Sequence, residues 1–216
     1  PYQEKFTKKS RKERVVLVPN TSHAFCRLMS AAMGSQGLRT EPLEIGREEA
    51  IRLGKQYVHN DICFPAQIVI GEALAALESG KYDLDHVAIA MGKYIGDCRL
   101  THYGALLRKA LDDAGYPQVP ILTNDDKDRH NLHPGYKMSL GTAIRIAFGL
   151  PMIDVLEELL RRMRPYETEP GSANRAFEEA MDLVMDGMER RGVLGAEQGF
   201  RQAIWRMKAV ACDRSE

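Results

Sequence analysis

Short apolar runs alternate with segments of helical periodicity over the first 135 residues. The predicted strands cover residues 15–19, 40–45, 86–91 and 119–123. The run at 86–91 is apolar almost throughout, as expected of a strand that is covered on both faces. Strands that alternate with helices build right-handed βαβ units and a parallel sheet. We therefore expect residues 14–135 to form an α/β domain with a flavodoxin-like, four-stranded parallel sheet and flanking helices.

Helical segments fill the intervals between these strands and continue beyond the last one. Within the α/β domain, the predicted helices cover residues 22–35, 47–56, 63–79 and 100–114. A polar loop follows at residues 124–134, and after it only helical spacing recurs. The later helices are predicted at residues 136–150 and 152–163, separated by Pro151, then from Ser172 to about Arg191, and after residues 192–195 to about Val210. We therefore expect residues 136–216 to form a helical extension.

Composition is typical of a globular protein of the cytoplasm. Basic and acidic residues balance at 30 each, so no basic surplus favours nucleic-acid binding. The apolar runs are too short for a membrane span, and the polar, basic residues 1–13 lack the apolar stretch of a signal peptide. Four cysteines are too few and too widely spaced for a disulfide scaffold. We expect residues 1–13 to be a linker, no membrane or nucleic-acid partner, and a cytoplasmic location.

Cys63 and Cys98 are the residues that most strongly suggest chemistry. Each lies where a predicted helix begins, in Asp61-Ile62-Cys63-Phe64-Pro65 and in Gly96-Asp97-Cys98-Arg99. Both starts belong to the edge where the parallel strands end. The amide donors and positive dipole of a helix N-terminus favour thiolates and anionic clusters. The pair therefore predicts a shared soft ligand, an iron–sulfur cluster; the alternative is two buried, inert cysteines.

Polar residues accompany this predicted site in the sequence. Those expected around it are Asn60, Asp61, Arg99, His102 and Tyr103. Asp61 has a second interpretation, as the cap of the helix that follows it. Cys26 is either a third ligand or a core residue, with core packing favoured. Cys212 is expected to be inert.

Three segments carry a resemblance to a known family. They read GKQYVHNDICFPAQIVIGEALAALESGKYD, GDCRLTHYGALLRKALDDAGYPQVPIL and RPYETEPGSAN. Over residues 6–180 the chain resembles the 2-hydroxyacyl-CoA dehydratase / benzoyl-CoA reductase subunit superfamily. More closely, it is similar to the dehydratase-like segment of large fused acyl-CoA dehydratase activase-related proteins. The approximate patterns of that group, N-D-x-C-[YF]-P and G-x-C-R-x-x-x-Y, match residues 60–65 and 96–103.

The resemblance implies an iron–sulfur function within a larger system. Dehydratase subunits of this superfamily have flavodoxin-like domains and hold a [4Fe-4S] cluster through three cysteines, the third from a following domain. An ATP-hydrolysing activase delivers a low-potential electron, which enables radical dehydration of a 2-hydroxyacyl-CoA, or ring reduction in relatives. Cys63 and Cys98 match the first two ligand positions. The implied partners are other domains of a larger parent chain, an ATP-dependent activase domain and an acyl-CoA substrate.

Two other functions stay open at this point, and so does the question of whether the chain is part of a lyase. The chain is alternatively a non-catalytic docking or scaffold domain of a multidomain activase-related protein, with amphipathic segments at 136–164 and 172–210 as its contact surfaces. It is alternatively a zinc protein that uses Cys63, Cys98 and His59, although zinc prefers four ligands and the sequence supplies no compact set. The isolated domain need not retain a cluster.

Overall fold

The computed structural model describes residues 4–44, 48–92, 96–123 and 133–213. Contacts divide them into two compact units. The α/β unit contains the chain up to Cys26 and residues 37–137, and the helical unit contains residues 27–36 and the chain from Met138 onward. The predicted ends of one strand and one helix near residues 45–47, and most of the predicted loop at 124–134, lie outside the described residues.

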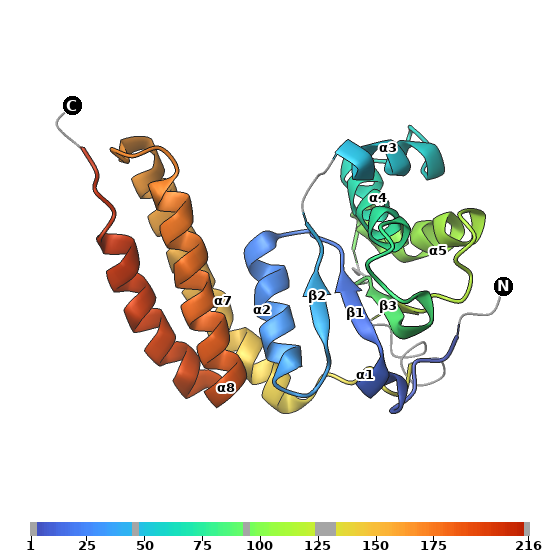
Figure 1. Ribbon diagram of the computed structural model, residues 1–216, viewed down its shortest axis with the longest axis horizontal. Helices are drawn as coiled ribbons and strands as arrows, with labels where there is room; N and C mark the ends of the chain where they lie inside the picture. The colour runs from blue at the N-terminus through green and yellow to red at the C-terminus, as the bar shows by residue number, and fades with distance from the viewer. Residues whose placement is uncertain (1–3, 45–47, 93–95, 124–132, 214–216) are drawn as a thin grey trace. The chain divides into compact units, whose positions relative to one another are not determined.

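The α/β unit is built on a parallel sheet (Figure 1). In spatial order its strands are β2 (Thr40–Pro42), β1 (Val15–Val18), β3 (Val87–Ala90) and β4 (Ile121–Leu122). Val16 is in register with Thr40 on one side and with Ala88 on the other. The order and the parallel pairing confirm the predicted flavodoxin-like α/β class. The chain first crosses from β1 outward to β2 and then back past β1 to β3, so the ends of β1 and β3 form a topological switch point, where ligands commonly bind.

Helices cover this sheet and share its core. They are α3 (Glu48–Tyr57), α4 (Phe64–Glu78) and α5 (Tyr103–Asp113), with the short 3-10 helices η1 (Leu84–His86) and η2 (Arg99–His102) before β3 and α5. The core includes Leu17, Ile70, Leu74, Ile89 and Leu107, all fully buried. Most residues of α4 are apolar or small and buried, which suits a helix enclosed between the sheet and its neighbours.

Helices α3 and α4 approach so closely that glycine is needed on both. A Cβ atom on Gly71 of α4 would lie 2.7 Å from the carbonyl carbon of Ala50 and 2.8 Å from the amide nitrogen of Gly54. A Cβ atom on Gly54 of α3 would lie 2.6 Å from the carbonyl carbon of Gln67. Because these neighbours are backbone atoms, they cannot move aside independently. The contact with α3 therefore fixes the position of α4, and with it the position of Cys63, the N-cap residue of α4.

The N-terminal residues pack on the α/β unit, in contrast to the predicted linker at 1–13. Helix α1 (Ser10–Glu13) forms within them, and Phe6 is fully buried. Gly135 donates its amide hydrogen to the Phe6 carbonyl at 2.9 Å. Arg14 donates to the Val87 carbonyl at 2.8 Å and pairs with Glu4. Phe6, a large apolar residue in a mostly polar segment, was the signal for this packing.

The helical unit contains α7 (Leu140–Met163), the 3-10 helix η3 (Arg164–Tyr166) and α8 (Ser172–Lys208). The predicted break at Pro151 is wrong, because α7 continues through it. Proline removes one hydrogen bond, to the carbonyl of Ala147, but both residues are exposed, so water can satisfy that carbonyl. The predicted break near residue 192 is confirmed, since Gly192 has non-helical dihedral angles with φ of 66°.

Two helical arms of α8, before and after Gly192, pack against each other through small residues. A Cβ atom on Gly187 would lie 2.7 Å from the Gly195 carbonyl carbon, and one on Gly199 would lie 2.7 Å from the Leu183 carbonyl carbon. The left-handed conformation of Gly192 permits the reversal between the arms. The described residues from Leu140 to Lys208 are thus mainly helical, as their spacing predicted.

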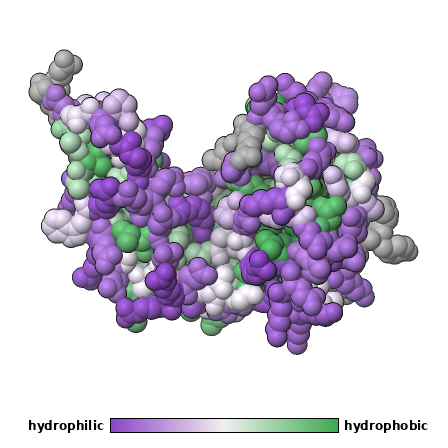
Figure 2. Space-filling model, in the orientation of Figure 1, coloured by the Kyte–Doolittle hydropathy of each residue, from purple (hydrophilic) through white to green (hydrophobic). Residues whose placement is uncertain are grey.

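Most of α2 (His23–Gly34), which links β1 to β2, belongs with the helical unit, although the sequence assigned it to the α/β domain. Arg27 bonds Glu178 at 2.9 Å and also pairs with Asp182. Leu28 is fully buried and would touch any side chain added at Gly149. In Figure 2, hydrophilic side chains cover much of the visible surface of this unit, with small hydrophobic patches between them. No helix of the described residues is long and apolar enough to cross a membrane.

Candidate functional site: two cysteines beside a buried tyrosine

Cys63 and Cys98 both precede a helix. Cys63 is the N-cap residue of α4, with extended dihedral angles, and its carbonyl accepts the first bond of that helix from the Ala66 amide at 3.0 Å. Pro65 follows in the first turn, where the missing amide hydrogen is not needed. Cys98 is the N-cap residue of η2, after β3. Since α4 leads back to the start of β3, its N-terminus belongs to the edge where the parallel strands end.

Two contacts bring the cysteine segments together. The Cys63 Sγ atom lies 3.0 Å from the Oη atom of Tyr103, the first residue of α5. The Arg99 guanidinium donates a hydrogen bond to the Asp61 carbonyl at 2.9 Å. One contact joins residues 40 positions apart and the other joins residues 38 apart. The turn before α4 and the turn after β3 are therefore neighbours, as the sequence predicted.

Both cysteines affect the pKa of the Tyr103 phenol. Its side chain packs in the core and the residue is 5% exposed. Burial raises the pKa of Tyr103, and the hydrogen bond to Cys63 and the negative charges of Cys63 and Cys98 raise the pKa further. The hydroxyl therefore keeps its proton. When Cys63 is a thiolate it can only accept, so Tyr103 is then the donor of the 3.0 Å hydrogen bond.

The predicted polar neighbours lie on the surface of this site. Asn60, Asp61 and Arg99 are exposed, and so is Cys98, whereas Cys63 is half-buried. The structure does not support Asp61 as the cap of α4, because Cys63 is the N-cap and the Asp61 carboxylate lies 3.4 Å from His59 Nδ1. Of these exposed residues, Arg99 donates a hydrogen bond from one segment to the other. The site thus has one open side at Cys98 and one buried side at Tyr103.

The other two cysteines lie elsewhere. Cys26 is 2% exposed, and its thiol donates to the Pro19 carbonyl at 3.7 Å, which agrees with core packing. Cys212 belongs to the helical unit and lies 3.9 Å from the Met163 carbonyl. Across the described residues, no group of three or more His, Cys, Asp or Glu side chains is placed to hold a metal ion. The pair of soft sulfur donors suits an iron–sulfur cluster as two of its ligands, and gives zinc only half of its usual set.

The third resembling segment, residues 164–174, has a structural role in the helical unit. Glu167 caps α8, because its carboxylate accepts hydrogen bonds from the Gly171 amide at 2.6 Å and the Ala173 amide at 2.7 Å. These bonds lower the pKa of Glu167. Ser172 was expected to be the cap, but it is the first helical residue and contributes a weaker contact to the same carboxylate at 3.4 Å. The Thr168 amide bonds the Ala211 carbonyl at 3.1 Å, which attaches the C-terminal residues to this turn.

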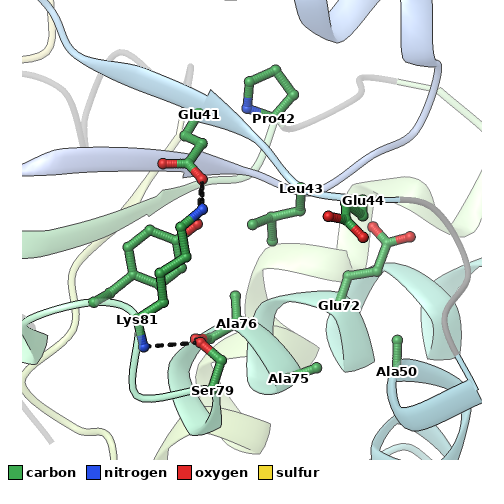
Figure 3. Close-up of a pocket in the computed structure, with 11 residues that line it drawn as sticks. Glu41, Pro42, Leu43, Glu44, Ala50, Glu72, Ala75, Ala76, Ser79 and Lys81 are labelled. Atoms are coloured by element: carbon green, nitrogen blue, oxygen red, sulfur yellow. Dashed lines mark hydrogen bonds and ion pairs between the residues drawn. The ribbon is translucent and has the colours of Figure 1, made fainter.

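A separate pocket of about 230 Å³ lies against β2 and α4 (Figure 3). Its polar wall contains Glu41, which accepts hydrogen bonds from Lys81 and, at 2.6 Å, from the Tyr82 hydroxyl. Burial raises the pKa of Glu41, but the hydrogen bonds from Lys81 and Tyr82 outweigh it and the pKa is lowered overall. Glu72 also lines the pocket; it is 4% exposed and accepts from the Asn20 amide at 2.9 Å.

Sequence reasoning missed both Tyr103 as the partner of Cys63 and Glu72 as a buried acid. Glu72 had a visible signal, since it is a charged residue within the apolar run IVIGEALAAL. Tyr103 was expected only to flank the site, because its pairing with Cys63 depends on how α5 packs beside α4. Neither cysteine lines the pocket of Figure 3, so the thiol site and the pocket are distinct features.

Searches for similar proteins found no match to a family model, a curated protein or a solved structure.

Proposed function

We propose that this chain is an iron–sulfur electron-transfer domain of a 2-hydroxyacyl-CoA dehydratase-like or acyl-CoA reductase-like system. Cys63 and Cys98 would contribute ligands to a [4Fe-4S] cluster, which an ATP-dependent activase reduces. The observation that carries the proposal is the joining of the two cysteine segments through the Cys63–Tyr103 and Arg99–Asp61 contacts. When bound, such a cluster supplies one-electron transfer at a potential set by its surroundings.

The residues of this chain have distinct parts in that proposal. Cys63 and Cys98 bind iron as thiolates, and the start of α4 favours negative charge at Cys63. Arg99 holds the two segments together and adds positive charge, while Asn60 and Asp61 complete the polar surroundings. The third cysteine comes from another domain of the parent chain and the fourth iron is open to substrate; both reach the site on the exposed side of Cys98. We place this system in the cytoplasm, where thiols stay reduced.

Iron incorporation in cysteine variants tests the proposal. Cys63→Ser and Cys98→Ser should each lose most of the iron and acid-labile sulfide of the anaerobically reconstituted protein. Cys212→Ser is the matched control, because its thiol lies in the helical unit, and it should retain the wild-type content. A Cys63→Ser Cys98→Ser double variant that binds as much iron as the wild type would refute the proposal.

A second candidate function, a docking or scaffold domain without a cluster, is favoured by one specific observation. Helix α7 exposes Leu140, Ile144 and Phe148, which recur at every fourth residue and so share one side of the helix. Exposed apolar rows of this kind commonly bind other protein surfaces. Phe148→Asp should then weaken binding of neighbouring domains of the parent protein in a pull-down, while iron content stays unchanged. Unchanged binding would count against this function.

A further inference from the structure

We infer that Tyr103 is a positioning residue that tunes the thiol site: its hydroxyl donates a hydrogen bond to the Cys63 thiolate and thereby raises the reduction potential of the bound cluster. The inference rests on the proposed function and adds a control element to it. One contact defines the residue pair: Tyr103 Oη lies 3.0 Å from Cys63 Sγ.

The position of the hydroxyl is fixed by packing. Tyr103 is 5% exposed, and its ring belongs to the core that Leu107 and Leu111 of the same helix also fill. Cys63 packs against that core from the start of α4. Because Cys63 at the start of α4 and Tyr103 at the start of α5 pack against the same core, the Sγ atom is held beside the phenol. The geometry is therefore set before any metal binds.

The direction of the effect follows from charge. Reduction adds one negative charge to the cluster, part of which resides on the cysteine sulfurs. A hydrogen bond to an ionised acceptor is stronger than one to a neutral acceptor. The donor therefore stabilises the reduced form more than the oxidised form, so the reduction potential rises, as hydrogen bonds to cluster sulfurs do in general. Cys98 is exposed and has water available, whereas the half-buried Cys63 relies on Tyr103.

Tyr103→Phe removes the hydroxyl and keeps the ring. We expect the variant to bind iron, and the ratio of reduced to oxidised cluster at a fixed potential to fall about tenfold, which is about 59 mV for a one-electron couple. The measurement is a redox titration followed by EPR. Tyr116→Phe is the matched control, since Tyr116 packs against the same core and bonds no cysteine among the described residues. It should leave the potential unchanged.

A second substitution covers the case in which Tyr103→Phe fails to fold. Incorporation of 3-fluorotyrosine at position 103 keeps the hydroxyl and makes it a stronger donor, so the potential should move upward, opposite to the effect of Tyr103→Phe. Equal potentials in the wild type and the Tyr103→Phe protein, or no upward shift with 3-fluorotyrosine, overturn this inference and leave the proposed function standing. A wild-type protein that binds no iron, either as this chain or with the other domains of its parent protein, overturns the proposed function, and this inference with it.

Discussion

Substitution of Gly71 tests whether the contact between α3 and α4 holds the α/β unit together. In Gly71→Ala the new Cβ atom would lie 2.7 Å from the Ala50 carbonyl carbon and 2.8 Å from the Gly54 amide nitrogen. Contacts under 3.0 Å are essentially never observed for Cβ atoms, so the two helices must separate. Overpacking of this kind costs about 1–3 kcal/mol, and the upper end applies where backbone atoms are the obstacle. Alanine returns about 1 kcal/mol of helix propensity, which leaves a net loss of about 2 kcal/mol.

Gly104→Ala is the matched control for this prediction. Gly104 also lies in a helix, α5, but its added Cβ atom would meet only a Thr123 methyl group at 4.0 Å, an ordinary contact. This variant should gain about 0.5 kcal/mol, because alanine is the better helix former. Urea unfolding followed by circular dichroism measures both changes. If Gly71→Ala were as stable as the wild type, the close approach of α3 and α4 would be refuted.

Two further predictions concern the helical unit. Glu167→Gln should lower the free energy of unfolding at pH 7, because the ionised carboxylate accepts hydrogen bonds from the first amides of α8. The pKa of Glu167 is lowered, so this stabilisation is fully present above the ordinary value of 4.5 and is lost as the pH falls through the folded pKa. The difference in free energy of unfolding between the variant and the wild type should therefore shrink in acid. Pro151→Ala should raise the free energy of unfolding by about 2 kcal/mol. Removing proline from a helix interior gains about 3 kcal/mol, and the greater freedom of the unfolded chain takes back up to about 1 kcal/mol. Thermal unfolding that shows no gain in stability would mean that α7 is not continuous through residue 151.

The sheet could be predicted because its signals are local. The apolar run that becomes β3 and the β-branched run that becomes β1 need no tertiary information, and the glycine at 192 marked the break in α8 correctly. Alternation of strands with helices then fixed a parallel arrangement, which in turn placed Cys63 and Cys98 at one edge.

The features that the sequence did not predict depend on distant partners. Pro151 reads as a helix break unless its exposure is known, and α2 reads as part of the α/β domain unless Arg27 is seen to pair with Glu178 and Asp182. Glu167 caps α8 from outside the helix, where Ser172 was the local expectation. The bond between Cys63 and Tyr103 arises only when α4 and α5 pack side by side.

The most direct test of the central claim is the iron and acid-labile sulfide content of this chain, purified and reconstituted without oxygen, together with its EPR spectrum before and after reduction. The account predicts near-stoichiometric iron and sulfide, and a cluster signal that appears on reduction and depends on Cys63 and Cys98. Absence of iron after reconstitution both of this chain and of the full-length parent protein, or a reducible cluster that persists when both cysteines are replaced by serine, would contradict it.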